Sequence, residues 1–253
     1  MRRWCRFASL LVACVILSPA RASTAAESAD ARVTVLAAAS LTEAFKSIGS
    51  AFEKTHPGLT VEFSFGASST LVIQIKEGAP GDVFASADES NMQAAADAGE
   101  LAGAARIFAT NRLTIVVPKG NPKRVTSLAD LSRSGVTVAL AAPQVPAGKY
   151  AAQIFTKAGV AVPQASQELD VRAVLNKVAM DEADAGIVYV TDIRAGGGKV
   201  EAVPIPEQYN VVARYPIAVL KHAAHPKEAQ AFVDFVLSPP GQATLAQFGF
   251  APP

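Results

Sequence analysis

Cysteine is nearly absent from this sequence. Two of the 253 residues are cysteines, and both of them, Cys5 and Cys14, lie close to the N-terminus. Beyond these two the chain can form no disulfide, and it has no thiolate to serve as a nucleophile or a metal ligand. Thiol chemistry is therefore excluded for almost the whole chain.

Histidine is also scarce, with His56, His222 and His225 as its three occurrences. The last two stand three positions apart, but no third metal ligand stands near them in the sequence. A zinc site needs three or four protein ligands, so a solvated turn or helix start explains this pair better. We expect no metal cation and no cofactor.

A long apolar run is missing as well. The apolar stretch FASLLVACVILSP at 7–19 is short for a membrane span, follows the basic MRRWCR, and precedes an A-x-A motif at 20–22. This order predicts a secretory signal peptide over residues 1–22, with cleavage after Ala22. An alternative is lipoprotein processing at Cys14, because LVAC resembles a lipobox. The A-x-A motif and the apolar residues after Cys14 favour the signal peptide.

The chain has no surplus of positive charge. It carries 23 basic and 22 acidic residues, and loss of residues 1–22 removes four arginines and no acid, leaving 19 against 22, or about −3. Proteins that bind nucleic acids through overall charge are strongly basic. We therefore expect no nucleic-acid partner.

The rest of the sequence alternates strand-like with helix-like segments. In the first series, strand patterns at 33–39, 59–65 and 81–88 are each followed by helical spacing, at 41–56, 71–78 and 89–99. The second series has strand patterns at 112–122, 135–143, 185–193, 199–206 and 214–221, and helical patterns at 147–159, 170–184, 226–238 and 240–250. Such alternation is typical of an α/β fold with mainly parallel sheets flanked by helices.

No low-complexity linker separates the two series. The sequence therefore favours two lobes joined by strand-like crossings near Asn111 and Tyr215, with a ligand cleft between them. We predict that lobe I comprises residues 32–110 plus 215–253 and that lobe II comprises residues 111–214. The helices at the C-terminus are expected to return to lobe I.

Candidate binding residues stand where strands lead into helices, the place where ligands bind in such sheets. Ser40 follows three alanines and precedes Glu43 by three residues, a spacing that fits a capping box. Capping alone explains this serine, whereas the alanines before it clear space for a ligand. The second junction offers Ser68, Ser69 and Thr70, one of which we expect to cap the helix.

The junctions of the second series offer mainly backbone groups. In the segment VPAGKY, Ala147 and Gly148 follow a proline that can set the turn, and their N–H groups are open to a ligand. Asp170 is expected to cap the next helix, which places Val171 at its first position. Tyr189 ends a strand with one phenolic donor, although a core or interface position also explains it.

These groups are neutral hydrogen-bond donors, which suits a small oxyanion held without lysine or arginine. Arg172 is near, but helical geometry points it away. A protonated anion needs an acceptor, so a fully deprotonated one is favoured.

Enzyme motifs are incomplete. The GASST segment lacks the second glycine of a G-x-S-x-G elbow. The AGGGK segment at 195–199 lacks the spacing of a phosphate-binding loop, so we interpret it as a hairpin turn. We expect no catalytic residues.

Six segments taken together resemble the periplasmic molybdate-binding proteins that feed bacterial ABC transporters. They occur in the same order and at similar separations, and they are AAASLT, FGASSTL, GAPGDVFASAD, VPAGKYA, DVRAVL and GIVY. The similarity covers nearly all of the chain after residue 32. It implies a type II periplasmic-binding-protein fold, in which two α/β lobes close over one tetrahedral oxyanion.

The resemblance also implies a set of ligand-binding residues: the hydroxyls of Ser40 and Ser68, the amides of Ala147 and Val171, and the hydroxyl of Tyr189. Two positions depart from the family pattern. Ala67 stands where a serine is common, so Ser69 remains an alternative to Ser68. Val190 stands where a small residue is usual.

The function implied by the resemblance is capture of molybdate, and also tungstate, in the periplasm and delivery to a membrane ABC permease. We expect a monomer. A sulfate- or thiosulfate-binding protein is the alternative within this class, and an enzyme on the same fold is the alternative outside it.

Overall fold

The computed structural model describes Met1 and residues 31–162 and 165–253. The predicted cleavage site after Ala22 and the alternative processing site at Cys14 lie outside the described residues. Within the described part, no helix is both long and apolar enough to cross a membrane. In chain order the elements are β1 (Ala31–Ala38), the 3-10 helix η1 (Ala39–Leu41), α1 (Thr42–Thr55), β2 (Leu59–Gly66), α2 (Ser68–Lys76), β3 (Val83–Ala85), α3 (Glu89–Asp97), β4 (Arg106–Pro118), the 3-10 helix η2 (Leu128–Ser132), β5 (Val138–Ala141), α4 (Pro146–Ala158), β6 (Ser166–Glu168), α5 (Val171–Ala179), β7 (Ala185–Tyr189), α6 (Asp192–Ala195), β8 (Val200–Pro204), β9 (Val212–Val219), α7 (Pro226–Leu237) and α8 (Pro239–Gln247).

The described strands form one curled sheet in the order β2-β1-β3-β9-β4-β7-β5-β6, with β8 paired to β4. Parallel pairing occurs in two groups, β2-β1-β3 and β6-β5-β7. Strands β4 and β9 join these groups and are antiparallel to all their partners. The predicted α/β class is confirmed, with the parallel pairing confined to the two outer groups.

The strand β4 runs through both halves of the sheet. Its first part, 106–112, pairs with β9, and its second part, 113–118, pairs with β7 and β8. The change of partner falls beside Asn111, where we predicted a crossing between the lobes. The lobe boundaries themselves stay a prediction, and we use the names lobe I and lobe II with the residue ranges given above.

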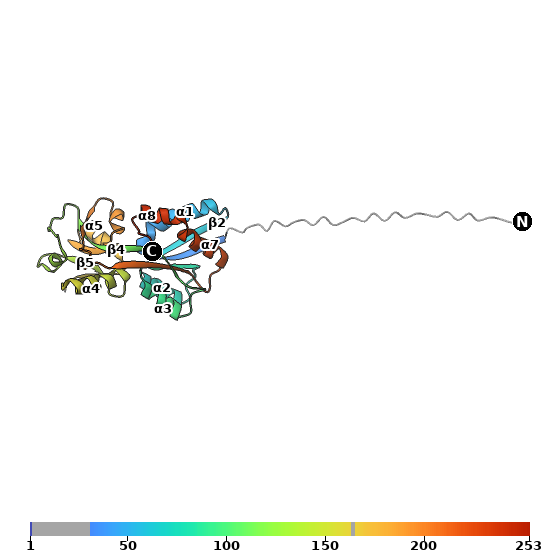
Figure 1. Cartoon of the computed structure of the whole chain (residues 1–253), viewed down its shortest axis with the longest axis horizontal. Coiled ribbons are helices and arrows are strands. Elements are labelled where there is room, and N and C mark those ends of the chain that lie inside the picture. The colour runs from blue at the N-terminus through green and yellow to red at the C-terminus, as the bar shows by residue number, and fades with distance from the viewer. Residues whose placement is uncertain (2–30, 163–164) are drawn as a thin grey trace.

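Helices cover both faces of the sheet (Figure 1). In lobe I, α1 packs beside α7 and α8 on one face, while α2 and α3 pack together on the other. In lobe II, α4 and α5 both contact β4, β5 and β7, and Figure 1 shows them on opposite faces. Helix α5 also contacts η1, so lobe II reaches across to lobe I at that point.

Aromatic side chains fill the core under α1. Phe45, Phe52 and Phe232 are fully buried, and the ring of Phe232 lies 6.1 Å from that of Phe45 and 5.5 Å from that of Phe52. The predicted helical spacing explains their position, because Phe45, Ile48 and Phe52 lie on one face of α1. Each such ring contributes about 1.5–3 kcal/mol by its burial, so this cluster anchors the helix that follows Ser40.

Three details differ from the sequence expectations. The short strand β6 was not predicted, since three residues, two half-buried and one exposed, give little pattern. Helix α5 ends at Ala179 rather than at 184, and Asp181 then takes a left-handed φ of 58°. The hairpin expected at 195–199 is wrong, because β7 and β8 both pair with β4 instead of with each other, and α6 lies between them.

Candidate functional site

One small cavity between the lobes brings together all five predicted residues. Ser40 and Ser68 line it from lobe I, and Ala147, Val171 and Tyr189 line it from lobe II. Inside it, about 10 Å³ is open to the centre of a water-sized sphere. Such a space suits one small ion and is far too small for a metabolite of ordinary size.

Three helix starts at or beside this cavity lack side-chain caps, whereas the fourth, α5, is capped by Asp170, which accepts from Ala173 N at 2.9 Å. Helices α2 and α4 follow Ala67 and Val145, whose side chains accept no hydrogen bond, and the same holds for Leu41 before α1. By contrast, Asp88 caps α3 by accepting from Asn91 N at 2.9 Å. An uncapped first turn presents free N–H groups and a partial positive charge, which together favour an anion.

Ser40 does not cap the following helix. It lies in the middle of η1, and α1 begins two residues later with no side-chain cap. The capping-box interpretation is therefore wrong, and its second member, Glu43, forms an ion pair with Arg172 instead. The buried hydroxyl of Ser40 lies 3.1 Å from that of Tyr215, on β9.

Ser68 is the first residue of α2, and its Oγ accepts a hydrogen bond from Ala87 N at 3.0 Å. The expectation that Ser68, Ser69 or Thr70 caps this helix is wrong, since Ala67 occupies the cap position. Of the two candidate serines, the structure places Ser68 on the cavity. Ser69 is buried but is not part of the lining.

The hydroxyl of Tyr189 is buried and has no hydrogen-bond partner among the described residues. Burial raises its pKa well above the usual value, and the nearby Tyr215 adds to this effect. The phenol is therefore neutral, and its hydrogen is available to an acceptor in the cavity. Tyr189 is packed edge-on between other aromatic rings, with its ring 5.7 Å from Tyr215 and 6.5 Å from Tyr150.

A series of polar contacts, through Asp192 and Arg172, holds the backbone of Tyr189. Its backbone N donates to Asp192 Oδ2 at 3.0 Å, and Asp192 Oδ1 lies 3.0 Å from Nε of Arg172. Arg172 Nε and Asp192 Oδ1 form an ion pair but no hydrogen bond, since neither atom has a hydrogen-bond partner among the described residues. Burial raises the pKa of Asp192 to about 6, against the opposing effect of Arg172. Arg172 itself does not line the cavity, as its helical position predicted.

Arg172 also crosses between the lobes. Both of its terminal nitrogens contact the carboxylate of Glu43 on α1, one of them at 3.0 Å. This contact could not be predicted from local patterns, because the two residues are separated by 129 positions. The pair places a cation of lobe II against an anion of lobe I.

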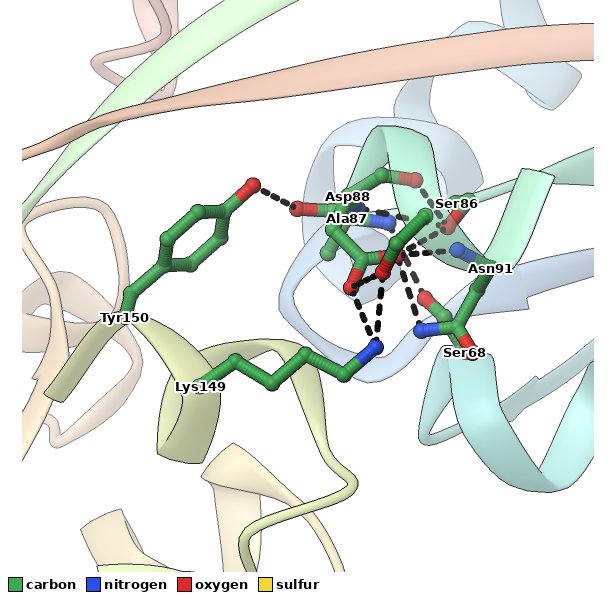
Figure 2. Close-up of polar contacts among 8 residues, drawn as sticks. Ser68, Ser86, Ala87, Asp88, Asn91, Lys149 and Tyr150 are labelled. Atoms are coloured by element: carbon green, nitrogen blue, oxygen red, sulfur yellow. Dashed lines mark hydrogen bonds and ion pairs between the residues drawn. The ribbon is translucent and has the colours of Figure 1, made fainter. Parts of the chain in front are cut away.

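A second polar cluster joins the lobes at the start of α3 (Figure 2). Lys149 of α4 donates to Asp88 Oδ2 at 3.0 Å and to Ser90 Oγ at 2.7 Å. Figure 2 shows the Lys149 side chain reaching toward Asp88, next to Ala87, whose N–H is bonded to Ser68. The turn that orients Ser68 is therefore held from both lobes.

The cavity lining contains neither a catalytic pair nor a cation site. Neither serine is hydrogen-bonded to a histidine or a carboxylate, since Ser40 contacts Tyr215 and Ser68 contacts Ala87 N. In the described part of the chain, no group of three metal-binding side chains comes together. A larger hollow of about 540 Å³ lies beside α3, but Tyr189, whose hydroxyl has no partner among the described residues, lines the small cavity.

Comparisons with known proteins agree with this architecture. The family model described as bacterial extracellular solute-binding protein matches residues 33–251. The molybdate-binding protein ModA of Mycobacterium tuberculosis is 44% identical over 243 residues, which cover 96% of this chain and 93% of that protein.

Solved structures show the same fold. The periplasmic molybdate-binding protein of Azotobacter vinelandii matches with a TM-score of 0.77 and 23% identity, covering 87% of this chain and 99% of that one. The sulfate-binding protein SubI of Mycobacterium tuberculosis matches with a TM-score of 0.80 and 23% identity, covering 88% and 87%. With its family model matched over 33–251 and a relative 44% identical along almost its whole length, this chain belongs to the bacterial extracellular solute-binding proteins.

Proposed function

We propose that this protein captures molybdate outside the cytoplasm and delivers it to an ABC permease. The 44% identical relative from Mycobacterium tuberculosis is a molybdate-binding protein, and the six sequence segments described above support the same ligand. Tungstate has nearly the same size and charge as molybdate, so we propose that it binds too. Residues 1–22 then direct export to the periplasm, where the protein acts as a monomer.

The observation that carries this proposal is the unpartnered hydroxyl of Tyr189. Leaving a buried hydroxyl without a partner costs about 1–3 kcal/mol, so the folded protein gains when an acceptor enters the cavity. An oxyanion brings such acceptors. The uncapped starts of α2 and α4 offer further donors at the same place.

In the proposed complex, each lobe supplies part of the donor shell. Ser40 and Ser68 donate through their hydroxyls, Ala147 and Val171 through their backbone N–H groups, and Tyr189 through its phenol. Removing a dianion from water is costly, so a nearly complete shell of donors is needed. Closure of the lobes about β4 and β9 completes the shell without any covalent step.

Sulfate is the second candidate ligand, because it is also a tetrahedral dianion. The likeness to SubI supports the fold but not the ligand. Sulfate and molybdate differ in size, so a rigid cavity that fits one of them binds the other less tightly. We expect molybdate to bind with a Kd of roughly 1 μM to 1 nM, or about −8 to −12 kcal/mol, and sulfate to bind far more weakly.

Thermal shift and calorimetry with molybdate, tungstate, sulfate and phosphate test the proposal. Strong stabilisation by molybdate and tungstate is the expected result, and equal stabilisation by sulfate and molybdate overturns the assignment. We also propose that the protein has no enzymatic activity, so phosphate and sulfate esters should remain intact. Turnover that persists through purification and disappears in Ser68→Ala overturns that part.

A further inference from the structure

We propose that the negative charge of Asp170 limits the affinity of the cavity for anions, and does so in proportion to the charge of the anion. This inference rests on the proposed function, because it concerns the anion held in the same cavity. Among the described residues that line the cavity, Asp170 alone carries a charge, and that charge has the same sign as the ligand.

Asp170 lies at the start of α5, directly before Val171, whose N–H we propose as a donor to the anion. Its Oδ1 accepts a hydrogen bond from Ala173 N at 2.9 Å, so the carboxylate is held over the first turn of the helix. The residue is half-buried. The carboxylate and the proposed anion therefore share one helix start, where they repel each other and compete for the partial positive charge of the helix.

No neighbouring cation neutralises this carboxylate. In the described part of the chain Asp170 has no ion pair, and the guanidinium of Arg172, two positions on, contacts Glu43 and Asp192 instead. Burial is the main cause of the raised pKa of Asp192, and the charge of Asp170 adds to it. Apart from the helix start itself, nothing offsets the charge of Asp170 at the cavity.

The other helix starts at the cavity show that a charged cap is not required there. Helices α2 and α4 begin after Ala67 and Val145, which provide no side-chain cap. Asparagine and serine cap helices about as well as aspartate and carry no charge. The charge at position 170 therefore lowers an affinity that a neutral cap would keep, and a lower affinity eases transfer of the ligand to a permease.

Repulsion of this kind depends on the charge of the ligand, which distinguishes it from a change in shape. Molybdate and perrhenate are both tetrahedral and nearly equal in size, but molybdate is a dianion and perrhenate is a monoanion. Near a protein surface, two charges a few ångströms apart interact strongly enough to change an equilibrium more than about tenfold. Loss of the Asp170 charge should strengthen molybdate binding about tenfold to a hundredfold, and perrhenate binding by the square root of that factor, about threefold to tenfold.

Calorimetry with molybdate, and competition of perrhenate against molybdate, measure both affinities at neutral pH in the mature protein. Asp170→Asn removes the charge and keeps the cap, and Asp170→Ser does the same with a different side chain. We expect both variants to gain more affinity for molybdate than for perrhenate. Asp170→Glu keeps the charge, so it should gain affinity for neither anion.

Asp181→Asn is the matched control. It removes the same charge from an exposed position beyond the other end of α5, and asparagine tolerates the left-handed φ of 58° found there. The net charge of the protein changes as it does in Asp170→Asn, but the cavity lining is untouched. Both affinities should stay at the wild-type value.

The outcomes separate this inference from the proposed function. A wild-type protein that does not bind molybdate overturns both. If the wild type binds molybdate, but Asp170→Asn and Asp170→Ser bind it no more tightly, the role of Asp170 alone is overturned. Equal gains for the two anions, or an equal gain in Asp181→Asn, also overturn it, because charge at the cavity would then not be the cause. If perrhenate does not compete, Asp170→Glu decides, since a gain as large as in Asp170→Asn excludes a charge effect.

Discussion

The two lobes contribute different kinds of donor to the cavity. Lobe I presents the side-chain hydroxyls of Ser40 and Ser68, each oriented by a separate hydrogen bond. Lobe II presents the backbone starts of α4 and α5, together with one phenol. A hydroxyl can be deleted by changing its own residue, whereas a backbone N–H can be moved only through the residues that shape the helix start. Substitutions in lobe I should therefore remove single donors, whereas substitutions in lobe II should act through the shape of a helix start.

The largest effect is expected in lobe II, from Gly148→Ala. A Cβ at Gly148 would lie 2.2 Å from Ala142 O and 2.4 Å from Ala141 O, so the start of α4 must shift away from β5. We expect the free energy of unfolding to fall by about 3 kcal/mol and molybdate affinity to fall with it. Denaturant melts and calorimetry measure the two quantities.

Gly103→Ala is the control for this substitution, because a Cβ at Gly103 has no neighbour within 4 Å. It should leave stability and affinity close to wild type. Wild-type stability in Gly148→Ala would show that the tight contact with β5 does not hold the helix start in place.

In lobe I, Ser40→Ala should lower molybdate affinity by more than the loss of a helix cap can explain. The variant leaves one oxygen of a buried dianion short of a donor, which should cost about 1.5–3 kcal/mol of binding, or roughly tenfold to a hundredfold. Ser40 does not cap α1, but its removal leaves the buried hydroxyl of Tyr215 without its partner, so the free energy of unfolding of the ligand-free form should fall by about 1–3 kcal/mol. Ser40→Gly should behave in the same way.

Ser238→Ala is the matched control, since Ser238 does cap its helix, α8. It should lower stability by about 1 kcal/mol and leave affinity unchanged. Wild-type molybdate affinity in both Ser40 variants would remove Ser40 from the site.

Asp192, which accepts a hydrogen bond from the backbone N of Tyr189, should make the stability of the protein depend on pH. The pKa of Asp192 is raised to about 6 in the folded protein, above its ordinary value of 3.8. Between these values the folded state holds the proton that the unfolded state has lost, so stability from this group is present below pH 4 and is lost as the pH rises through 6. A pKa difference of about two units corresponds to a change of up to about 3 kcal/mol.

Asp192→Asn removes this titration. The difference in unfolding free energy between wild type and variant should fall from pH 4 to pH 6.5 and then level off. A difference that stays flat across this range would mean that Asp192 is ionised throughout, paired with Arg172.

The smallest effect concerns the ion pair between the lobes. Glu43→Gln keeps the shape of the side chain but removes its charge from the Arg172 contact. We expect a twofold to fivefold loss of molybdate affinity, up to about 1 kcal/mol, that shrinks at high salt. Glu62→Gln, which breaks the exposed pair with Arg32 inside lobe I, should leave affinity unchanged. Equal effects of the two variants would argue against a role for Arg172 in closure.

Local patterns predicted much of this structure. Helical spacing identified α1, the strand ends identified the junctions, and Asp170 caps α5 as expected, accepting from Ala173 N at 2.9 Å. These features depend on residues a few positions apart, which is the range over which periodicity and capping rules apply. The five candidate residues came from such junctions and from the family resemblance.

The partners of those residues could not be predicted in this way. Tyr215 is 175 positions from Ser40, and Lys149 is 61 positions from Asp88. The caps assigned to Ser40 and to the Ser68 segment were wrong for the same reason. A serine before a helix fits the capping rule locally, but here the tertiary partners, Tyr215 and Ala87 N, determine where each hydroxyl points.

The position of β9 in the sheet has a consequence for biosynthesis. Because β9 lies between β3 and β4, lobe I cannot be completed until Val212–Val219 has been made. The 126 residues from Ser86 to Val211 separate β3 from β9, and at roughly 5–20 residues per second they take on the order of 6–25 s to synthesise. During that time the nascent chain has an unpaired sheet edge and exposed apolar surface. For the export proposed above this delay is an advantage, because an incomplete lobe keeps the chain unfolded enough to pass through a membrane.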